Sequence, residues 1–519
     1  MPAPMTASAD QAATPAPAHP QTRWSVVVNL ATWALPIVLA IGAMPILWRE
    51  LGAAGYGAYV LAAGYATIAT SFAPLRGTAQ RVAAAPADPA ALARVVRGAY
   101  LAAGLTGTLT AAGFLLGAPA LVRFAGIDPV ADPAALAAFR IAAAAALALH
   151  LAQAARGVLI GRERYLAYGI HLTGASIATT VGTVLLARMG YRAPGLLLWL
   201  ACVGVAAAAA GLALTWPRGV RPARAVGATT GVVPRAGVIG EAWAIAGFGG
   251  VVLATDSLIS VYVLAERMIL ARAAGLAEVP FYTVPLTLAS ALQNALAAAS
   301  IVMLPRAGAA AARGDADALR VLYARAVTVV MTVGIGGSAA LAAAAGPLLA
   351  AWMDPGFAAR TAGVAAILVA AFCVNAVATP MWTLAEGVGR PGRNTALIAA
   401  IAVAGCAAGL AWAPAHGPAG MATARMVAML FAVPAFVLAG ERAISGRIDA
   451  ALWRGLARHL GPAAVLLLAA EAAAAHRLAG MPRVAVAFGL VLPYAAWIWH
   501  TPLFDAATRR SLRRLAGLR

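Results

Sequence analysis

The chain has 519 residues, of which 62% are hydrophobic and only 11% are charged. A soluble domain of this size needs a larger share of charged residues to cover its surface, so the composition excludes a soluble globular protein. The formal net charge of +20 does not indicate nucleic-acid binding, because the arginines sit in short segments between apolar runs, where the positive-inside effect explains them.

The chain begins with an Ala- and Pro-rich stretch, residues 1–22, which we expect to be a disordered tail. The apolar run from Trp24 to Trp48 follows it and is too long for the core of a signal peptide. We therefore predict a retained first helix.

Six apolar segments in the first part of the chain have about the length that crosses a bilayer as a helix. They are Trp24–Trp48, Gly55–Leu75, Val95–Leu121, Ala137–Ala155, Tyr165–Ala187 and Ala193–Thr215. Together they define a predicted N-terminal lobe, residues 23–215, and an Arg-, Pro- and Gly-rich cytoplasmic linker, 216–238, follows them.

A second set of six segments defines a predicted C-terminal lobe, residues 239–440. They are Ile239–Ala271, Val279–Leu304, Val321–Leu349, Thr361–Leu384, Asn394–Trp412 and Pro418–Ala439. A basic linker, 441–455, leads to two further helices within 456–500, Leu456–Ala475 and Val484–Trp499, and to a basic tail, 501–519. The predicted fold class is an all-α polytopic membrane protein with about fourteen transmembrane helices.

An even number of crossings places both termini on the same side of the membrane. With the termini in the cytoplasm, arginines on the cytoplasmic side outnumber those outside by roughly three to one, as the positive-inside rule requires. We therefore predict a multi-pass protein of a cytoplasmic membrane with both termini cytoplasmic.

Short motifs recur in the same order in the two sets of six helices, about 225 residues apart. Arg49, Gly52 and Tyr59 have the spacing of Arg272, Gly275 and Tyr282; Gly161-Arg162 matches Gly389-Arg390; and "GYRAPG" matches "HGPAG". Each unit holds six helices, so the pattern predicts two lobes with the same orientation, related by an axis along the membrane normal, with a substrate cleft between them.

Several of these segments resemble the oligosaccharide flippases, the polysaccharide-biosynthesis branch of the multidrug/oligosaccharidyl-lipid/polysaccharide exporter superfamily. They are "LWRELGAAGYGAYVLA", "RGVLIGRERYLAYGI", "AERMILARAAGLAEVPFYTVPLTLASAL", "MLPRAG", "LAEGVGRPGRN" and "HGPAGMATA". The resemblance implies a transporter that flips undecaprenyl-diphosphate-linked oligosaccharide from the inner to the outer leaflet of a bacterial inner membrane by alternating access. It implies no enzyme activity and no cofactor or metal. Expected partners are the lipid-linked oligosaccharide, membrane lipids and enzymes that synthesise or polymerise the glycan.

Charged residues inside membrane helices are candidate functional residues, because each costs about 2.5–3.5 kcal/mol to insert. Asp256 and Glu266 are candidates for ion coupling, and Asp256 has the alternative of a structural pair with Arg425. Arg267 and Arg272 are candidates for diphosphate binding or, alternatively, extend to the outer interface.

The candidate substrate-cavity residues combine arginines with polar side chains inside the predicted helices: Arg425, Asp256, Asn29, Asn294, Asn375, Arg49 and Arg76. Arg49 is interpreted either as an outer gate or as an anchor of a helix end. Amides such as Asn29, Asn294 and Asn375 either bind sugar hydroxyls or bond between helices. Asp315, in "GDAD", is predicted to cap a helix rather than to bind a nucleotide sugar.

Two rival functions stay open at this point. A drug/cation antiporter of the same superfamily would share the fold and use Asp256 as its cation site. A membrane enzyme such as a sugar polymerase would typically carry a large outer loop, and no predicted outer loop is longer than roughly 20 residues.

Overall fold

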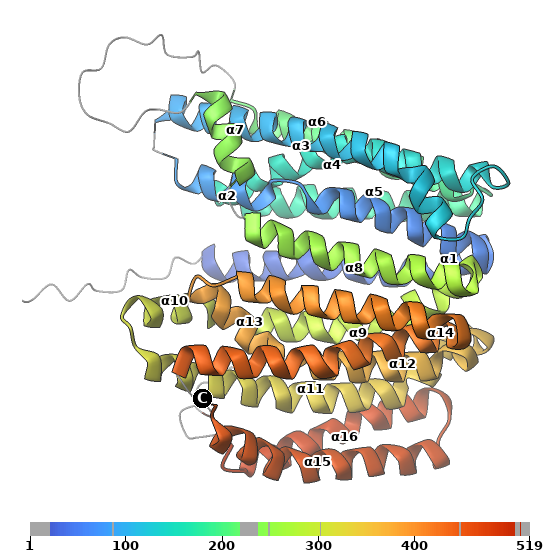
Figure 1. The fold of residues 1–519 in the computed structure, drawn as a ribbon, viewed down its shortest axis with the longest axis vertical. Coiled ribbons are helices and arrows are strands. Elements are labelled where there is room, and N and C mark those ends of the chain that lie inside the picture. Colours follow the sequence, from blue (N-terminus) through green and yellow to red (C-terminus); the bar gives the residue numbers. More distant parts are fainter. Residues whose placement is uncertain are drawn as a thin grey trace, which may run out of the picture.

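The computed structural model describes residues 21–85, 88–217, 237–247, 250–300, 303–445, 448–503 and 509, and the described elements are all helices. Ten of them are long and apolar enough to cross a membrane. Figure 1 shows them side by side in one layered bundle, with α1 starting and α16 ending at the same end. We call this the inner end and the opposite one the outer end.

The first half of the chain forms seven of the described helices. They are α1 (Gln21–Ser71), α2 (Leu75–Ala83), α3 (Pro89–Phe124), α4 (Pro133–Gly161), α5 (Tyr165–Arg188), α6 (Ala193–Thr215) and α7 (Val238–Gly247). We call α1–α6 the N-lobe.

The second half forms the remaining helices. They are α8 (Gly250–Ala274), the short η1 (Leu276–Glu278), α9 (Val279–Ser300), α10 (Leu304–Ala312), α11 (Ala316–Trp352), α12 (Pro355–Ala376), α13 (Ala378–Gly387), α14 (Gly392–Ser445), α15 (Ala450–Arg477) and α16 (Gly480–His500). We call α8–α14 the C-lobe. α15 and α16 pack on it through α11.

The two longest helices each contain two membrane crossings joined at a glycine. In α1 the chain reverses at Gly52 (φ 68°, ψ 175°), and in α14 at Gly417 (φ 53°, ψ −133°). A side chain with a Cβ rarely adopts such angles, so glycine marks both turns. Counted this way, the helices give about fourteen crossings, as the apolar segments predict.

Several helices begin one or two turns before the predicted positions because aspartates cap them. The side chain of Asp88 accepts hydrogen bonds from the backbone of α3, Asp132 from that of α4 and Asp354 from that of α12. Each is followed by a proline, which suits the first helical position. Asp315 caps α11 in the same way, at 2.9 Å from the amide of Ala318, which confirms that prediction.

Three predicted helices correspond to two shorter helices each, whereas Gly55–Leu75 ends near its predicted position, where Pro74 separates it from α2. Ile239–Ala271 corresponds to α7 and α8, and Val279–Leu304 to α9 and the first residue of α10; residues 248–249 and 301–302 lie outside the described part of the structure. Thr361–Leu384 is divided into α12 and α13 at Val377. These were predicted as continuous because an apolar run carries no signal that distinguishes one long helix from two short ones.

The two halves repeat backbone geometry. Gly275 ends α8 with φ 94°, as Gly52 ends the first crossing with φ 68°. After α4 the amide of Arg164 bonds the carbonyl of Leu159, and after α13 the amide of Arg390 bonds that of Ala385. Arg164 is therefore the structural counterpart of Arg390, which corrects the predicted match of Arg162 to Arg390 by two residues.

The predicted divisions along the chain fall partly outside the described residues, namely residues 1–20, most of 216–238 and nearly all of 504–519. α7 lies beyond the predicted linker but packs on α3 of the N-lobe, where Gly98 leaves room for Glu241. The Nε of Arg81, in α2, donates to Glu241 at 3.1 Å. The connection between the lobes thus continues through α7.

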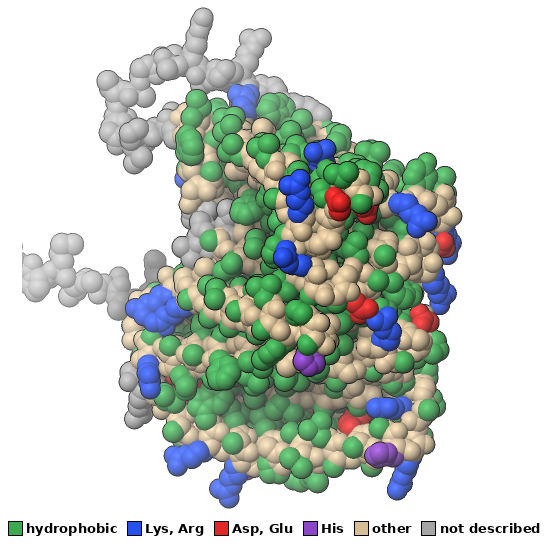
Figure 2. Space-filling view, turned by 45° about the vertical axis from the view of Figure 1, so that its right-hand side comes forward, with side chains coloured by type: hydrophobic (Ala, Val, Ile, Leu, Met, Phe, Trp, Pro, Cys, Tyr) green, Lys and Arg blue, Asp and Glu red, His purple; other side chains and the backbone are tan. Residues whose placement is uncertain are grey.

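The surface of the bundle is largely apolar. Figure 2 shows hydrophobic side chains, together with backbone and other uncharged side chains, over much of the visible face, with charged side chains in a minority. Large apolar side chains such as Leu116, Phe431 and Leu492 are more than 70% exposed. A lipid environment satisfies such a surface, and the chain is therefore a multi-pass membrane protein.

Candidate functional site

The lobes are joined at the outer end by a cluster that we call the outer seal, formed by Trp48, Phe281, Asp354 and Phe357. The indole nitrogen of Trp48 donates to the carboxylate of Asp354 at 3.0 Å. Its ring lies 5.4 Å from the ring of Phe281 and 5.0 Å from that of Phe357. Such edge-on aromatic contacts stabilise the pair beyond the apolar area that they bury.

Further contacts close the same end. Trp352 donates to the carbonyl of Ile41 at 3.2 Å, and Arg49 donates to the carbonyl of Met353 at 3.4 Å. Gly57 lies so close to Leu276 that a Cβ there would overlap the Leu276 carbonyl. Arg49 thus connects the lobes, and the outer end of the bundle is closed in this structure.

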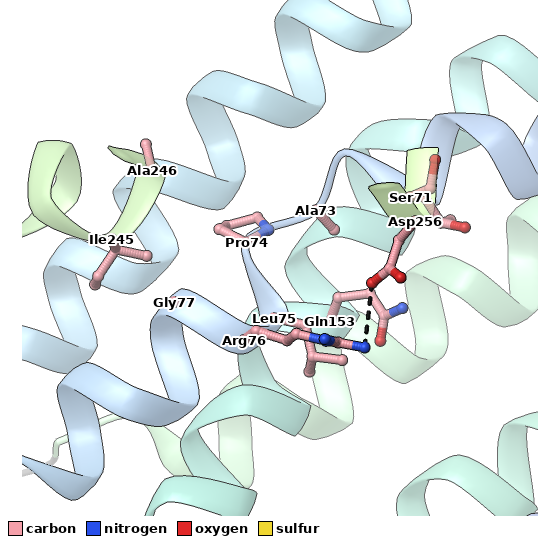
Figure 3. Close-up of a pocket in the computed structure, with 11 residues that line it drawn as sticks. Ser71, Ala73, Pro74, Leu75, Arg76, Gly77, Gln153, Ile245, Ala246 and Asp256 are labelled. Atoms are coloured by element: carbon pink, nitrogen blue, oxygen red, sulfur yellow. Dashed lines mark ion pairs between the residues drawn. The ribbon is translucent and has the colours of Figure 1, made fainter. Parts of the chain in front are cut away.

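Near the inner end, residues of both lobes line a pocket of about 150 Å³ that we call the inner pocket. Arg76 and Asp256 face one another across it, with 3.3 Å between Nη2 and Oδ2, and Gln153 of α4 lies beside them (Figure 3). The break at Pro74 makes room for this pocket, because the chain leaves the helical path between Ser71 and Leu75.

The Arg76–Asp256 pair is a weak connection between the lobes. The two side chains are 61% and 43% exposed, so water screens their attraction. The hydroxyl of Ser257 adds one hydrogen bond to the carbonyl of Ser71, at 3.3 Å. Among the described side chains, the inner end is therefore held by fewer and more exposed contacts than the outer seal.

A larger cavity of about 310 Å³, which we call the central cavity, lies between α1 and α5 of the N-lobe and α8 and α9 of the C-lobe. Its polar lining residues are Tyr56, Tyr59, Thr67, Thr179, Thr180, Thr183, Arg267, Thr283 and Thr287. Arg267 is the charged residue of this lining, and its Nε is buried without a hydrogen-bond partner. A cation among hydroxyls favours an anionic, polyhydroxylated ligand.

Glu266, next to Arg267, faces the interior of the C-lobe instead. Both of its oxygens accept hydrogen bonds from Arg425, the Oε1 contact being 3.0 Å, and Arg425 also donates to the hydroxyl of Tyr282 at 3.2 Å. The Arg425 guanidinium lies 4.7 Å from the ring centre of Tyr262. Glu266 and Arg425 are 0% and 4% exposed, so they form a buried pair.

This pair corrects two interpretations. Arg425 does not pair with Asp256, because the partner of Asp256 is Arg76. Arg425 is also enclosed by packing rather than facing a cavity in this state. Because Arg425 engages both oxygens of Glu266, Glu266 has less capacity to bind a transported ion than the half-exposed Asp256.

The structure separates the two arginines predicted to hold diphosphate. Arg267 lines the central cavity, whereas Arg272 is exposed at the outer end, 5.7 Å from the ring centre of Phe124. Asn294 is exposed and Asn375 half-buried, and neither lines the inner pocket or the central cavity. The side chain of Asn29 lies outside the described part of the structure.

Sequence reasoning missed most of the residues that line the central cavity. The threonines of α5 occupy positions 179, 180 and 183, which share one helix face by their spacing. That spacing could have been recognised in the sequence as a polar helix face. However, threonine is common in membrane helices and does not by itself indicate a site. Trp48 and Asp354 lie 306 residues apart, and no local pattern connects them.

Comparison with protein-family models and with curated sequences finds no match. Solved structures do match. The lipid II flippase MurJ in an inward closed conformation superposes with a TM-score of 0.67 at 8% identity, covering 91% of this chain and 98% of that one.

Two further matches are a multidrug resistance MATE family transporter of the MOP superfamily in two conformations. The inward-facing one gives a TM-score of 0.59 at 14% identity, covering 81% of this chain and 98% of that one. The outward-facing one gives 0.51 at 15% identity, covering 82% and 95%. The chain therefore has the two-lobed fold of MOP superfamily transporters, which confirms the predicted fold class.

Proposed function

We propose that this protein is an alternating-access transporter that flips an undecaprenyl-diphosphate-linked oligosaccharide from the inner to the outer leaflet of a bacterial cytoplasmic membrane, for surface polysaccharide synthesis. The fold supports transport in general, since its structural neighbours are a lipid II flippase and multidrug transporters. The choice of substrate rests on the central cavity.

The observation that carries the substrate class is Arg267 in that cavity. Its guanidinium matches a phosphate, and the threonine and tyrosine hydroxyls around it match sugar hydroxyls. The described lining of the cavity contains no carboxylate that would attract a cationic drug, and Arg267 repels one. The cavity therefore favours an anionic head group.

The cavity volume of about 310 Å³ is at the lower end of the range for ligand pockets, about 300–1,000 Å³. An oligosaccharide head group needs more room, which opening of the weakly joined inner end would supply. The contrast between the outer seal and the hydrated inner contacts supports entry from the inner leaflet.

The drug/cation antiporter is the second candidate function. Asp256 favours it, as a half-exposed carboxylate in a pocket between the lobes, but Arg76 already neutralises this charge. Within the flippase proposal, Asp256 is the residue that couples flipping to protons, because releasing Arg76 on protonation would free the inner end to open.

Cellular placement and partners complete the proposal. The arginine bias supports a cytoplasmic location for the inner end and both termini. A lipid-linked glycan that reaches the outer leaflet needs enzymes that build it on one side and extend it on the other, so glycosyltransferases and a glycan polymerase are the expected partners.

Replacing Arg267 with Gln is expected to reduce flipping by at least about tenfold, since a charge-assisted phosphate contact contributes about 1.5–3 kcal/mol. The measurement is transfer of a fluorescent undecaprenyl-diphosphate-linked saccharide between leaflets of proteoliposomes. Arg272→Gln is the matched variant on the same helix and is expected to retain flipping. Equal activity of Arg267→Gln and the parent protein would contradict the assignment of the cavity, as would export of cationic drugs without any saccharide transfer.

Replacing Asp256 with Asn is expected to leave the fold intact, with a loss of less than about 1 kcal/mol in the free energy of unfolding, because the pair with Arg76 is half-exposed. The variant should lose the acceleration of flipping by an imposed proton gradient. Thermal unfolding in detergent and flipping with and without the gradient measure the two effects. Unchanged acceleration would exclude Asp256 as the coupling residue.

A further inference from the structure

One face of α5 carries four hydroxyl side chains: Ser176, Thr179, Thr180 and Thr183. With 3.6 residues per turn these four positions fall within an arc of about 100°, on one side of the helix. From Ser176 to Thr183 the line extends about 10 Å along the helix axis, at 1.5 Å per residue. It therefore covers about a third of the bilayer core, which is about 30 Å thick, with hydroxyl groups.

This face joins two cavities. A pocket of about 270 Å³ between α1, α4, α5 and α6, which we call the N-lobe pocket, is lined by Arg156, Ser176, Thr179 and Thr180 among other residues. Thr179 and Thr180 also line the central cavity that contains Arg267. The two cavities thus meet at these threonines.

A side-chain hydrogen bond joins the lining of the N-lobe pocket to that of the inner pocket. Gln153 lines the inner pocket beside Arg76 and Asp256 (Figure 3). Its Oε1 accepts a hydrogen bond from Nη1 of Arg156 at 3.1 Å. Arginines consequently occur in three successive compartments, from Arg76 near the inner end through Arg156 to Arg267 near the outer end.

Arg156 is a membrane-embedded cation whose contacts are neutral. Its Nε donates to Nδ1 of His171 at 3.4 Å, and Nε2 of His171 donates to the carbonyl of Ala207 at 2.8 Å. Among the described residues no carboxylate pairs with Arg156, and the lining of its pocket is free of acidic side chains. His171 and Gln153 hold the guanidinium in place without neutralising it.

We propose that Arg156 is a second anion-binding station, which holds the phosphate groups of the substrate before they reach Arg267. The inference deepens the proposed flippase function and rests on it. The polar head travels from the inner pocket to the N-lobe pocket and along the α5 threonines to the central cavity. The ligand class is an organic diphosphate, whose charge each arginine binds in turn while the hydroxyls of α5 replace water.

The test uses a cysteine reporter in the full-length protein. Cys202, Cys373 and Cys406 are replaced by Ala, and Ser176→Cys is introduced in the N-lobe pocket. Labelling rates are measured in detergent with an anionic and with a cationic methanethiosulfonate. A positive charge about 7 Å away in water speeds labelling by the anionic reagent about 2.7-fold and slows labelling by the cationic reagent by the same factor. Arg156→Gln is therefore expected to lower the anionic-to-cationic rate ratio about sevenfold.

Two variants complete the comparison. Arg156→Lys keeps the charge and is expected to retain the parent ratio. Arg162→Gln removes an exposed arginine from the same end of α4 and is expected to leave the ratio unchanged. The proposal that Arg156 binds the substrate phosphates would be overturned by a labelling ratio that does not depend on Arg156. It would also be overturned if neither reagent reached the introduced thiol at position 176.

A second measurement keeps Arg156 intact and so does not depend on how its variants fold. Undecaprenyl diphosphate is expected to slow labelling of Ser176→Cys at least about threefold, whereas undecaprenol, which lacks the phosphates, should not. Absence of protection would overturn the assignment of the ligand. The parent protein could also fail to flip the saccharide while the labelling ratio still depends on Arg156 and undecaprenyl diphosphate still protects position 176. That result would contradict only the proposed function, so the two failures are distinguishable.

Discussion

Replacing Arg425 with Met while Glu266 remains is expected to lower the free energy of unfolding by about 3–5 kcal/mol, the cost of leaving a buried charge without its partner. Glu266 is fully buried, and both of its oxygens depend on the Arg425 guanidinium for hydrogen bonds. The pair connects α8 to α14 across the C-lobe, and thermal unfolding of the purified protein measures its loss.

The double variant Glu266→Leu/Arg425→Met separates charge from packing. Because it removes both charges and keeps apolar volume, it is expected to recover most of the stability. Arg360→Gln is the control from the same lobe, since its pair with Glu278 is half-exposed and should contribute less than about 1 kcal/mol. A single variant as stable as the parent would show that Glu266 is neutral in the folded protein.

Hydrophobic run length predicted the fold well. A bilayer fixes how many apolar residues a crossing needs, and this constraint holds whatever the tertiary contacts are. The internal repeat of the two lobes could also be predicted, because backbone geometry constrains the turns between helices. Turns such as those at Gly52 and Gly275 need backbone angles that favour glycine, so equivalent turns preserve it while the apolar helices between them diverge.

The helix ends were predicted less well. Arg156 was assigned to a cytoplasmic loop, but α4 continues to Gly161, because alanine-rich sequence with an arginine propagates a helix and nothing before Gly161 stops it. This displacement of six residues placed Arg156 outside the membrane and concealed a charge in the N-lobe pocket. Asp-Pro pairs give a sharper signal for helix starts, as at Asp132 and Asp354.

Pairing between distant residues was beyond the sequence. The position of Asp256 in α8 allows pairing with arginines of several other helices, so its partner depends on tertiary geometry. In the structure that partner is Arg76. Arg425 and Glu266 are 159 residues apart. Their charge and their predicted depth in the membrane identified these residues as candidates. Only the packing of the helices shows that Glu266 and Arg425 form a buried pair and that Asp256 and Arg76 form an accessible one.

Replacing Trp48 with Ala is expected to open the outer end. The substitution removes the hydrogen bond to Asp354 and the ring contacts to Phe281 and Phe357, which belong to the outer-closed state. Truncation of a fully buried Trp costs about 3–5 kcal/mol, and Trp48 is half-buried, so the equilibrium should shift toward the outward-open state by at least about tenfold. Spin labels at Val130→Cys and Ala415→Cys, both at the outer end, should report a longer distance by pulsed electron resonance.

Two matched variants define what the outer seal contributes. Trp48→Phe keeps an aromatic ring and loses only the N–H, so it should shift the distance less, in line with about 1.5–3 kcal/mol for a hydrogen bond to a charged group. Trp412→Ala removes a tryptophan that is 37% exposed and should leave the distance unchanged. An unchanged distance in Trp48→Ala would mean that the backbone contact of Gly57 with Leu276, rather than the aromatic cluster, holds the lobes together. Because that contact contains no side chain that a substrate can displace, the outer end would then open by movement of η1 and not by release of the seal.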